Sequence, residues 1–240
     1  MMKDLRKYIA EALGTFILVL AGLGAYMMTG DEFTTALVFG FTLVGVIFIV
    51  GPISGSHVNP AISLAFALNK KLSWKDFIFY VAAQIIGAVV AVLSLLVIVA
   101  LEVQGEGTMD AFKGFFANTF QNDLPYFNSM AVAFLITMAM TFVLIIAVLG
   151  VVRKVENKTA AAFEIGLMLT AVILVGGLVN PAANIATALF SGADAMKDLW
   201  VFIAAPLVGA VLAALTAMFL FKGEPETEGT KPKITEPTKK

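Results

Sequence analysis

The residues of this chain best placed for polar chemistry are two asparagines, each followed by the same pair of residues. Asn59-Pro60-Ala61 and Asn180-Pro181-Ala182 both lie inside long apolar stretches. A carboxamide offers N–H donors and an oxygen acceptor. We therefore expect these side chains to hydrogen-bond polar groups within an otherwise apolar surrounding.

Other chemical groups are scarce in the 240 residues. There is no cysteine and the single histidine is His57, which excludes thiolate metal sites and thiol nucleophiles and leaves little for a transition metal. The sequence shows no Ser/His or paired-aspartate arrangement that is plausibly placed for catalysis. The sequence predicts neither an enzyme nor a metal or other cofactor, and a net charge of −1 gives no basic surface for nucleic acid.

Composition indicates the environment of these asparagines. Hydrophobic residues make up 60% of the chain, charged residues only 14%, and the mean hydropathy is +0.93. A soluble domain is about half apolar and a quarter charged. The chain is therefore predicted to be an integral membrane protein surrounded by lipid.

Six apolar stretches approach the roughly 20 residues that a bilayer-spanning helix needs. They are residues 8–28, 33–51, 76–101, 129–151, 157–174 and 198–221. Lysine and arginine gather before the first span and after the second and fourth, whereas the other connections are mainly acidic. Since basic loops stay in the cytoplasm, we predict a multi-pass protein of the plasma or bacterial inner membrane with both termini cytoplasmic.

The two asparagine segments outside these spans are copies of one another. Residues 59–68 match residues 180–189 at six of ten positions, with a shift of 121. Each half contributes three spans, an odd number, so the halves must lie upside down relative to each other. The expected domain is residues 1–221, with repeats at about 5–101 and 127–221, followed by a disordered cytoplasmic tail at 222–240.

Each copy is predicted to begin a short helix. Asparagine is a favoured N-cap and proline suits the first helical position. Ten residues rise about 15 Å, half of a hydrocarbon core of about 30 Å. The fold class predicted is therefore all-α: six transmembrane helices plus two re-entrant half-helices whose N-termini meet at the midplane, in an inverted 3+3 repeat.

These features resemble the aquaporin and glycerol-facilitator family, the major intrinsic proteins. The resemblance rests on the two Asn-Pro-Ala boxes, on SGSHVNPA (54–61) and on AEALGTF (10–16), and covers about residues 5–221. It implies a homotetramer in membrane lipid, with one pore per subunit that passes water and small uncharged solutes passively. Paired asparagine N–H groups and two helix N-termini, each about half a positive charge, would favour neutral solutes over cations.

The resemblance also identifies a selectivity region near the outer mouth, where this chain departs from the family. It places Phe39 and Ile173 in the ring that sets the pore width, and it puts Ala183 where the family has an arginine. The only arginines, Arg6 and Arg153, lie on the predicted cytoplasmic side. With a short return loop at 174–179, we expect a wide, apolar vestibule that passes glycerol-sized neutral solutes and water.

Three further polar residues lie in or beside the predicted spans. By resemblance, Glu11 supports a re-entrant loop through backbone N–H groups, and its counterpart in the fourth span is lost near Phe134 and Leu135. His57 either makes a static hydrogen bond or gates the pore by protonation. Glu164 either faces the cytoplasmic half of the pore or extends to the membrane interface.

Two other functions share parts of this pattern. A secondary transporter of a small neutral solute also uses inverted repeats and broken helices, but it needs ion-coupling carboxylates. A closed family member with a structural role is the other alternative, because the arginine is missing. Flux without an ion gradient separates a channel from both.

Overall fold

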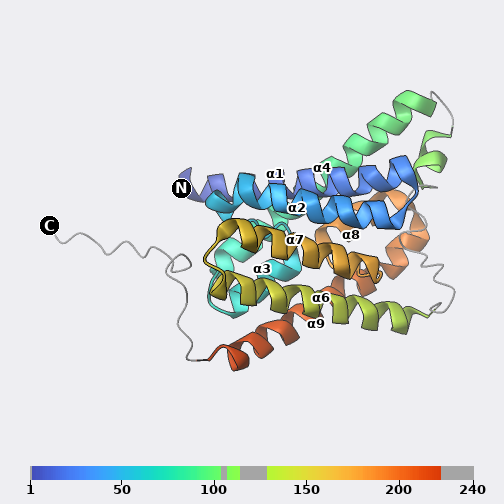
Figure 1. The fold of residues 1–240 in the computed structure, drawn as a ribbon. Helices are drawn as coiled ribbons and strands as arrows, with labels where there is room; N and C mark the ends of the chain where they lie inside the picture. The colour runs from blue at the N-terminus through green and yellow to red at the C-terminus, as the bar shows by residue number, and fades with distance from the viewer. Residues whose placement is uncertain (1, 104–106, 114–128, 223–240) are drawn as a thin grey trace.

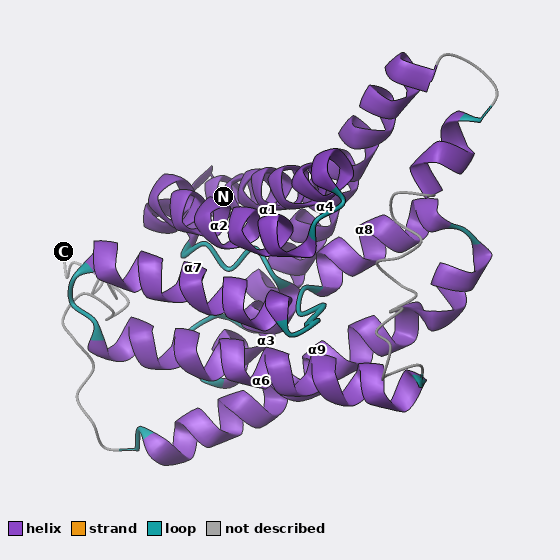
Figure 2. Cartoon of the chain, turned by 45° about the vertical axis from the view of Figure 1, so that its right-hand side comes forward, coloured by secondary structure: helices purple, strands orange, loops and turns teal. Residues whose placement is uncertain are grey.

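The computed structural model describes residues 2–103, 107–113 and 129–222, and every regular element in these ranges is a helix (Figure 2). The helices run in the order α1 (Met2–Thr29), α2 (Glu32–Ser54), α3 (Pro60–Leu68), α4 (Trp74–Val103), α6 (Met130–Lys154), α7 (Lys158–Leu174), α8 (Pro181–Ser191) and α9 (Ala193–Leu220). A further helical turn covers residues 108–113. The predicted tail falls almost wholly outside the described residues, as do residues 127–128 of the second repeat.

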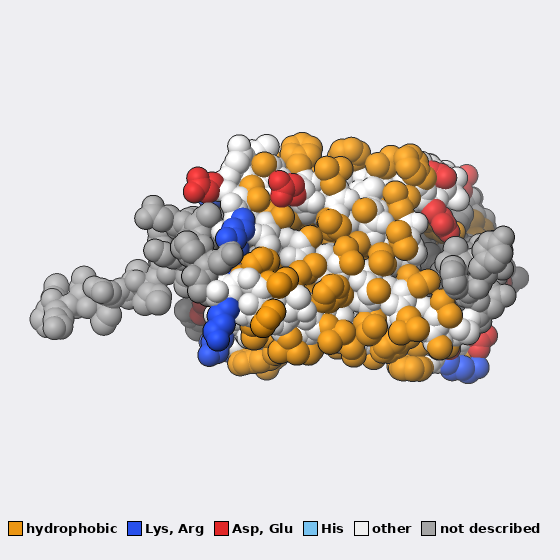
Figure 3. All heavy atoms as spheres, turned by 60° about the horizontal axis from the view of Figure 1, so that its bottom comes forward, with side chains coloured by type: hydrophobic (Ala, Val, Ile, Leu, Met, Phe, Trp, Pro, Cys, Tyr) orange, Lys and Arg blue, Asp and Glu red, His pale blue; other side chains and the backbone are white. Residues whose placement is uncertain are grey.

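The long helices form the six predicted spans. Five of them, α1, α2, α4, α6 and α9, are long and apolar enough to cross a bilayer. The sixth, α7, has 17 residues, the lower limit for a span, and rises about 25 Å. On the face shown in Figure 3, hydrophobic side chains cover the middle and most of the charged side chains lie towards the two ends.

The direction of the helices alternates in the way that an inverted repeat requires. In Figure 1, α1, α4 and α7 run one way along the long axis, and α2, α6 and α9 run the opposite way. The short helices α3 and α8 lie in opposite halves of the molecule, between the long ones. At 9 and 11 residues they rise about 14 and 16 Å, so end to end they match the thickness of a bilayer core.

Glycines allow the long helices of each repeat to pack closely. The Gly87 position of α4 lies against the carbonyl oxygen of Ala12 on α1, and the Gly209 position of α9 lies in the same way against that of Met138 on α6. Any side chain at either glycine would collide with this backbone. The two crossings, of α4 with α1 and of α9 with α6, are therefore alike, and α2 packs against α7 between the repeats.

Candidate functional site: a channel between two helix N-termini

Both asparagines cap the half-helices that they begin. The Asn59 side-chain oxygen accepts the N–H of Ala61 at 2.8 Å, and the Asn180 oxygen accepts that of Ala182 at 3.1 Å. Pro60 and Pro181 occupy the first helical positions, where an N–H would have no helical partner. These caps fix the oxygen of each carboxamide and so aim its nitrogen away from its own helix.

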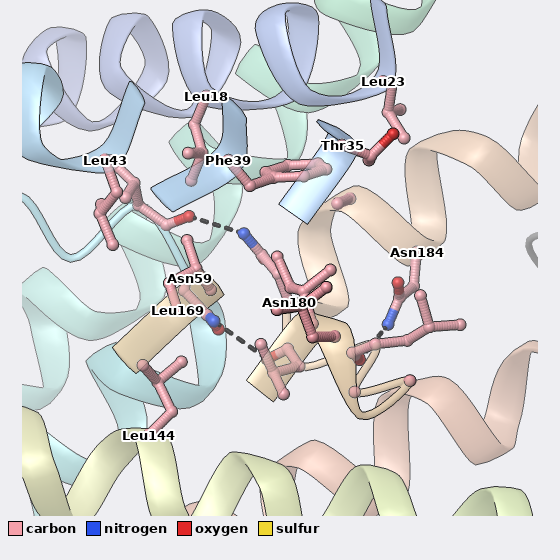
Figure 4. A pocket seen from close by; sticks show the side chains of 18 of the residues that line it. Leu18, Leu23, Thr35, Phe39, Leu43, Asn59, Leu144, Leu169, Asn180 and Asn184 are labelled. Carbon is pink, nitrogen blue, oxygen red and sulfur yellow. Dashed lines mark hydrogen bonds between the residues drawn. The ribbon is translucent and has the colours of Figure 1, made fainter. Parts of the chain in front are cut away.

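The two caps are joined to each other across the repeats. Asn59 Nδ2 donates to the carbonyl oxygen of Val179 at 3.0 Å, and Asn180 Nδ2 donates to that of Val58 at 2.9 Å. These reciprocal bonds tie each half-helix to the loop that leads into the other (Figure 4). Each carboxamide has two N–H groups, and the bond across the repeats uses one of them.

Asn59 and Asn180 both line a cavity of about 520 Å³. Its wall is mostly apolar and comes from both repeats (Figure 4). Polar side chains also line it, among them Glu32 at the start of α2, Thr35 one turn further on, and His57 beyond the asparagines. The cavity therefore extends to both sides of the paired amides.

The three residues assigned to the selectivity region all line this cavity: Phe39, Ile173 and Ala183. The Phe39 ring covers the Gly22 position of α1, where a Cβ would collide with it. With alanine at 183, no arginine is among the lining residues that the structure describes. Glu164 is exposed on α7 and is not among the residues that line this cavity.

The return loop before α8 is as short as the sequence indicated. After α7 ends, Gly176 takes a φ of 86°, a left-handed conformation that favours glycine. The N–H of Gly177 donates to the carbonyl oxygen of Val172 at 3.0 Å. The chain then reaches Asn180 through Leu178 and Val179, and all of residues 173–180 line the cavity.

Glu11 holds the first re-entrant loop and is fully buried. Its Oε1 accepts the N–H of His57 at 3.0 Å; its Oε2 accepts the N–H of Val58 at 2.7 Å and Nε2 of Gln84 at 2.8 Å. Val58 has a φ of 43°, a strained conformation for a β-branched residue. The carboxylate thus helps to hold the strained residue whose carbonyl oxygen bonds Asn180.

His57 lies in the same buried cluster. Its Nδ1 is 3.2 Å from the hydroxyl oxygen of Ser63, and its ring packs against Phe66 and Tyr80, with centroids 4.4 and 5.3 Å away. Gln84 Nε2 donates to the same Ser63 hydroxyl at 2.9 Å. Ser63 and Gln84 were not among the predicted site residues, because their roles depend on contacts between separate helices.

The counterpart of Glu11 is Thr137, not the neighbourhood of Phe134 and Leu135. Two features align α1 with α6: the close contacts of Gly87 and Gly209, and matching bonds from Thr15 to the Glu11 carbonyl and from Thr141 to the Thr137 carbonyl. Both give a shift of 126 residues, five more than the shift between the half-helices. The carboxylate is indeed absent from the second repeat, but at a different position.

Two re-entrant helix N-termini joined through their asparagines define a membrane channel of inverted repeats. The family model for the major intrinsic proteins matches residues 1–217. The chain therefore belongs to the major intrinsic protein family, as its motifs predicted. Members of this family are channels and not enzymes.

Individual relatives cover nearly the whole chain. It is 37% identical over 220 residues to "Glycerol uptake facilitator protein-like 6" of Lactiplantibacillus plantarum, which covers 89% of this chain and 97% of that protein. It is 34% identical to "Aquaporin Z" of Bradyrhizobium diazoefficiens, over 90% of this chain and 94% of the relative. "Aquaporin Z" of Brucella melitensis is 37% identical, over 88% and 96%.

A solved structure confirms the fold. The X-ray structure of the aquaglyceroporin from Plasmodium falciparum superposes with a TM-score of 0.67 at 23% identity, covering 88% of this chain and 94% of that one. Together with the family and the apolar helices, this makes the protein a helical membrane channel.

Proposed function

We propose that this protein is a passive channel for water and small uncharged solutes of the glycerol type, with a pore in each subunit. The observation that carries the proposal is the pair Asn59 and Asn180, which face each other's loops at 2.9–3.0 Å and both line the cavity. Each amide retains a second N–H, which suits it to donate to the oxygen of a passing water or alcohol.

The same arrangement disfavours ions. Two helix N-termini point towards one place, and each carries about half a positive charge, so a cation meets a repulsive field there. The mainly apolar wall offers no set of groups to replace the hydration shell of an ion. A neutral solute with hydroxyl groups loses less hydration energy than an ion on entering the pore, and the asparagines offer it hydrogen-bond donors.

The outer part of the cavity supports the choice of polyols. The arginine expected at position 183 is an alanine, and Phe39 and Ile173 present apolar surface beside it. A polyol has a carbon backbone as well as hydroxyl groups, and both kinds of surface find partners in such a vestibule. We assign these three residues to selectivity and the two Asn-Pro-Ala boxes to the centre of the pore.

The carboxylates do not favour a coupled transporter. Glu11 already accepts three N–H groups and supports the loop, and Glu32 lies at the exposed start of α2. Neither is placed to bind a coupling ion beside a substrate at the asparagines. Flux is therefore expected to follow the solute gradient alone.

Stopped-flow measurements on proteoliposomes test this proposal with water, glycerol and urea, at equal ion concentrations inside and out. We expect water and glycerol to enter faster than into empty liposomes, with a low activation energy and without any ion gradient. Water flux with glycerol rejected would overturn the assignment of polyols. A requirement for an ion gradient would overturn the channel itself.

We also propose that four copies form a homotetramer, with both termini in the cytoplasm. Support for the orientation comes from the basic residues at the C-terminal end of α6, Arg153 and Lys154, and after α3, Lys70 and Lys71. Cross-linking in the membrane, read by mass, tests the assembly. Protease access to a C-terminal tag in right-side-out and inverted vesicles tests the orientation. Cleavage of the tag in right-side-out vesicles but not in inverted ones would contradict it.

A further inference from the structure

The second re-entrant loop is not held in the way that the first one is. In the first repeat, Glu11 and Gln84 reach the loop from α1 and α4. The equivalent positions in the second repeat are Thr137 and Pro206, because the shift from α4 to α9 is 122 residues. Pro206 has no hydrogen-bonding side chain, and the single hydroxyl oxygen of Thr137 cannot accept the three N–H groups that the Glu11 carboxylate accepts.

Pro206 also creates a polar group that needs a donor. Proline has no N–H, so the helical bond from residue 206 to the carbonyl oxygen of Phe202 cannot form. Within a membrane a released carbonyl must find another donor inside the protein. Phe202 itself is 1% exposed, so water cannot serve.

Asn184 meets both needs with one side chain. Its Nδ2 donates to the carbonyl oxygen of Phe202 at 2.9 Å and to that of Leu178, in the re-entrant loop, at 2.8 Å. Asn184 is 5% exposed and lies on α8 beside the cavity (Figure 4). A carboxamide has two N–H groups, so these bonds use both of them.

We propose that Asn184 is a positioning residue of the pore, which holds the second re-entrant loop against α9. The inference rests on the proposed channel function and adds a residue that neither Asn-Pro-Ala box contains. Leu178 is followed by Val179, whose carbonyl oxygen binds the amide of Asn59. By holding Leu178, Asn184 sets the position of the acceptor that orients Asn59.

This arrangement affects what a solute meets along the path. The carbonyl oxygen of Leu178 is occupied by Asn184, and that of Val179 is occupied by Asn59. Each of these carbonyl oxygens thus has one of its two lone pairs engaged by an asparagine amide. The equivalent residue of the first repeat, Ser63, has a single hydroxyl donor and could not bind two carbonyl groups at once.

The test uses the full-length protein and separates loop positioning from helix repair. Asn184→Ala releases both carbonyl groups. Asn184→Ala with Pro206→Ala restores the helical N–H for Phe202, so α9 is repaired while Leu178 stays released. The matched controls are Pro206→Ala alone and Thr141→Val. Thr141→Val removes a buried hydroxyl that, among the described residues, bonds only the Thr137 carbonyl of the same helix.

The first measurement is hydrogen–deuterium exchange of the loop peptide 175–180 in nanodiscs. The two Asn184→Ala proteins should exchange about fivefold faster than the wild type, the equivalent of one lost hydrogen bond, and the controls should not. The second measurement is stopped-flow flux, in which glycerol permeability should fall about fivefold and water permeability less than twofold.

The outcomes distinguish this inference from the proposed function. Two results would overturn the role of Asn184. One is a wild-type rate of hydrogen–deuterium exchange in the loop of the Asn184→Ala, Pro206→Ala protein. The other is an equally accelerated rate in Pro206→Ala alone. Faster exchange with an unchanged ratio of glycerol to water flux would overturn its effect on the pore. If wild-type liposomes conduct neither solute, the proposed function fails, while the exchange experiment still judges Asn184.

Discussion

Replacing Glu11 by glutamine tests whether a buried carboxylate holds the first re-entrant loop in place. Three N–H groups converge on its two oxygens, from His57, Val58 and Gln84, at 2.7–3.0 Å. Glutamine has nearly the same shape but only one oxygen, and its NH2 group must face at least one of these donors. The change therefore removes hydrogen bonds without creating a cavity.

The size of the effect follows from the bonds that are lost. A hydrogen bond to a charged group contributes about 1.5–3 kcal/mol, and the left-handed backbone of Val58 costs about 1–3 kcal/mol that its surroundings must offset. We expect Glu11→Gln to lower the free energy of unfolding by about 3 kcal/mol, which corresponds to a fall in Tm of about 10 °C. Glu11→Ala should lower the free energy of unfolding further.

The assay combines thermal stability in detergent with stopped-flow flux in liposomes. As the loop relaxes, the carbonyl oxygen of Val58 moves away from Asn180, so we expect glycerol flux to fall several-fold. Thr15→Val is the control, since Thr15 is also fully buried on α1 and, within the described part of the chain, its hydroxyl bonds only the Glu11 carbonyl. If Glu11→Gln changes neither Tm nor flux beyond this control, Glu11 does not hold the loop.

Three other perturbations give separate tests. Ala183→Arg adds bulk and a cation to the wall of the cavity and should reduce glycerol flux more than water flux; equal effects would contradict a role in selectivity. Gly87→Ala drives a methyl group into the α1 backbone and should destabilise the protein. Gly45→Ala is the control, because a Cβ there meets nothing within 4 Å, and it should be neutral or stabilise the protein by about 0.5–1 kcal/mol. Similar Tm values for the two variants would refute the close packing at Gly87. The Thr34 hydroxyl and N–H hold the pKa of Asp31 below its ordinary value, so this cap is present above about pH 4 and is lost as the pH falls further. As the pH falls through this range, hydrogen–deuterium exchange of the amides at the start of α2, corrected for the pH dependence of the intrinsic exchange rate, should rise in the wild type and stay level in Asp31→Asn. A rise in both proteins would argue against the cap.

Much of the fold could be predicted because its main signals are local. Asn59 and Asn180 act as N-caps, and prolines at the next position begin each helix, whatever the rest of the chain does. Two copies of one motif in halves with three spans each then require the inversion. The family was evident from the same residues, and the family model confirms it.

The parts that could not be predicted depend on how separate helices align. The shift between repeats is 121 residues at the half-helices, 122 from α4 to α9 and 126 from α1 to α6. A single shift therefore misplaces the partner of Glu11 by several residues, and it conceals that Pro206 stands in the place of Gln84. Because the role of Asn184 depends on that proline, no local pattern identifies it.

The two repeats share the crossing of their long helices, but the side chain that holds each loop binds it differently. The first loop is bound through N–H groups by a buried carboxylate, and it contains two non-glycine residues with positive φ, Ser56 and Val58. The second loop is bound through a carbonyl group by an amide, and its only positive φ is at Gly176. A strained loop needs a stronger restraint, and charge-assisted bonds are about twice as strong as neutral ones. The stronger restraint, by Glu11, thus acts on the more strained loop and the weaker one, by Asn184, on the less strained loop. The inverted repeat requires that the two asparagines lie together, but it does not require that the two loops be held in the same way.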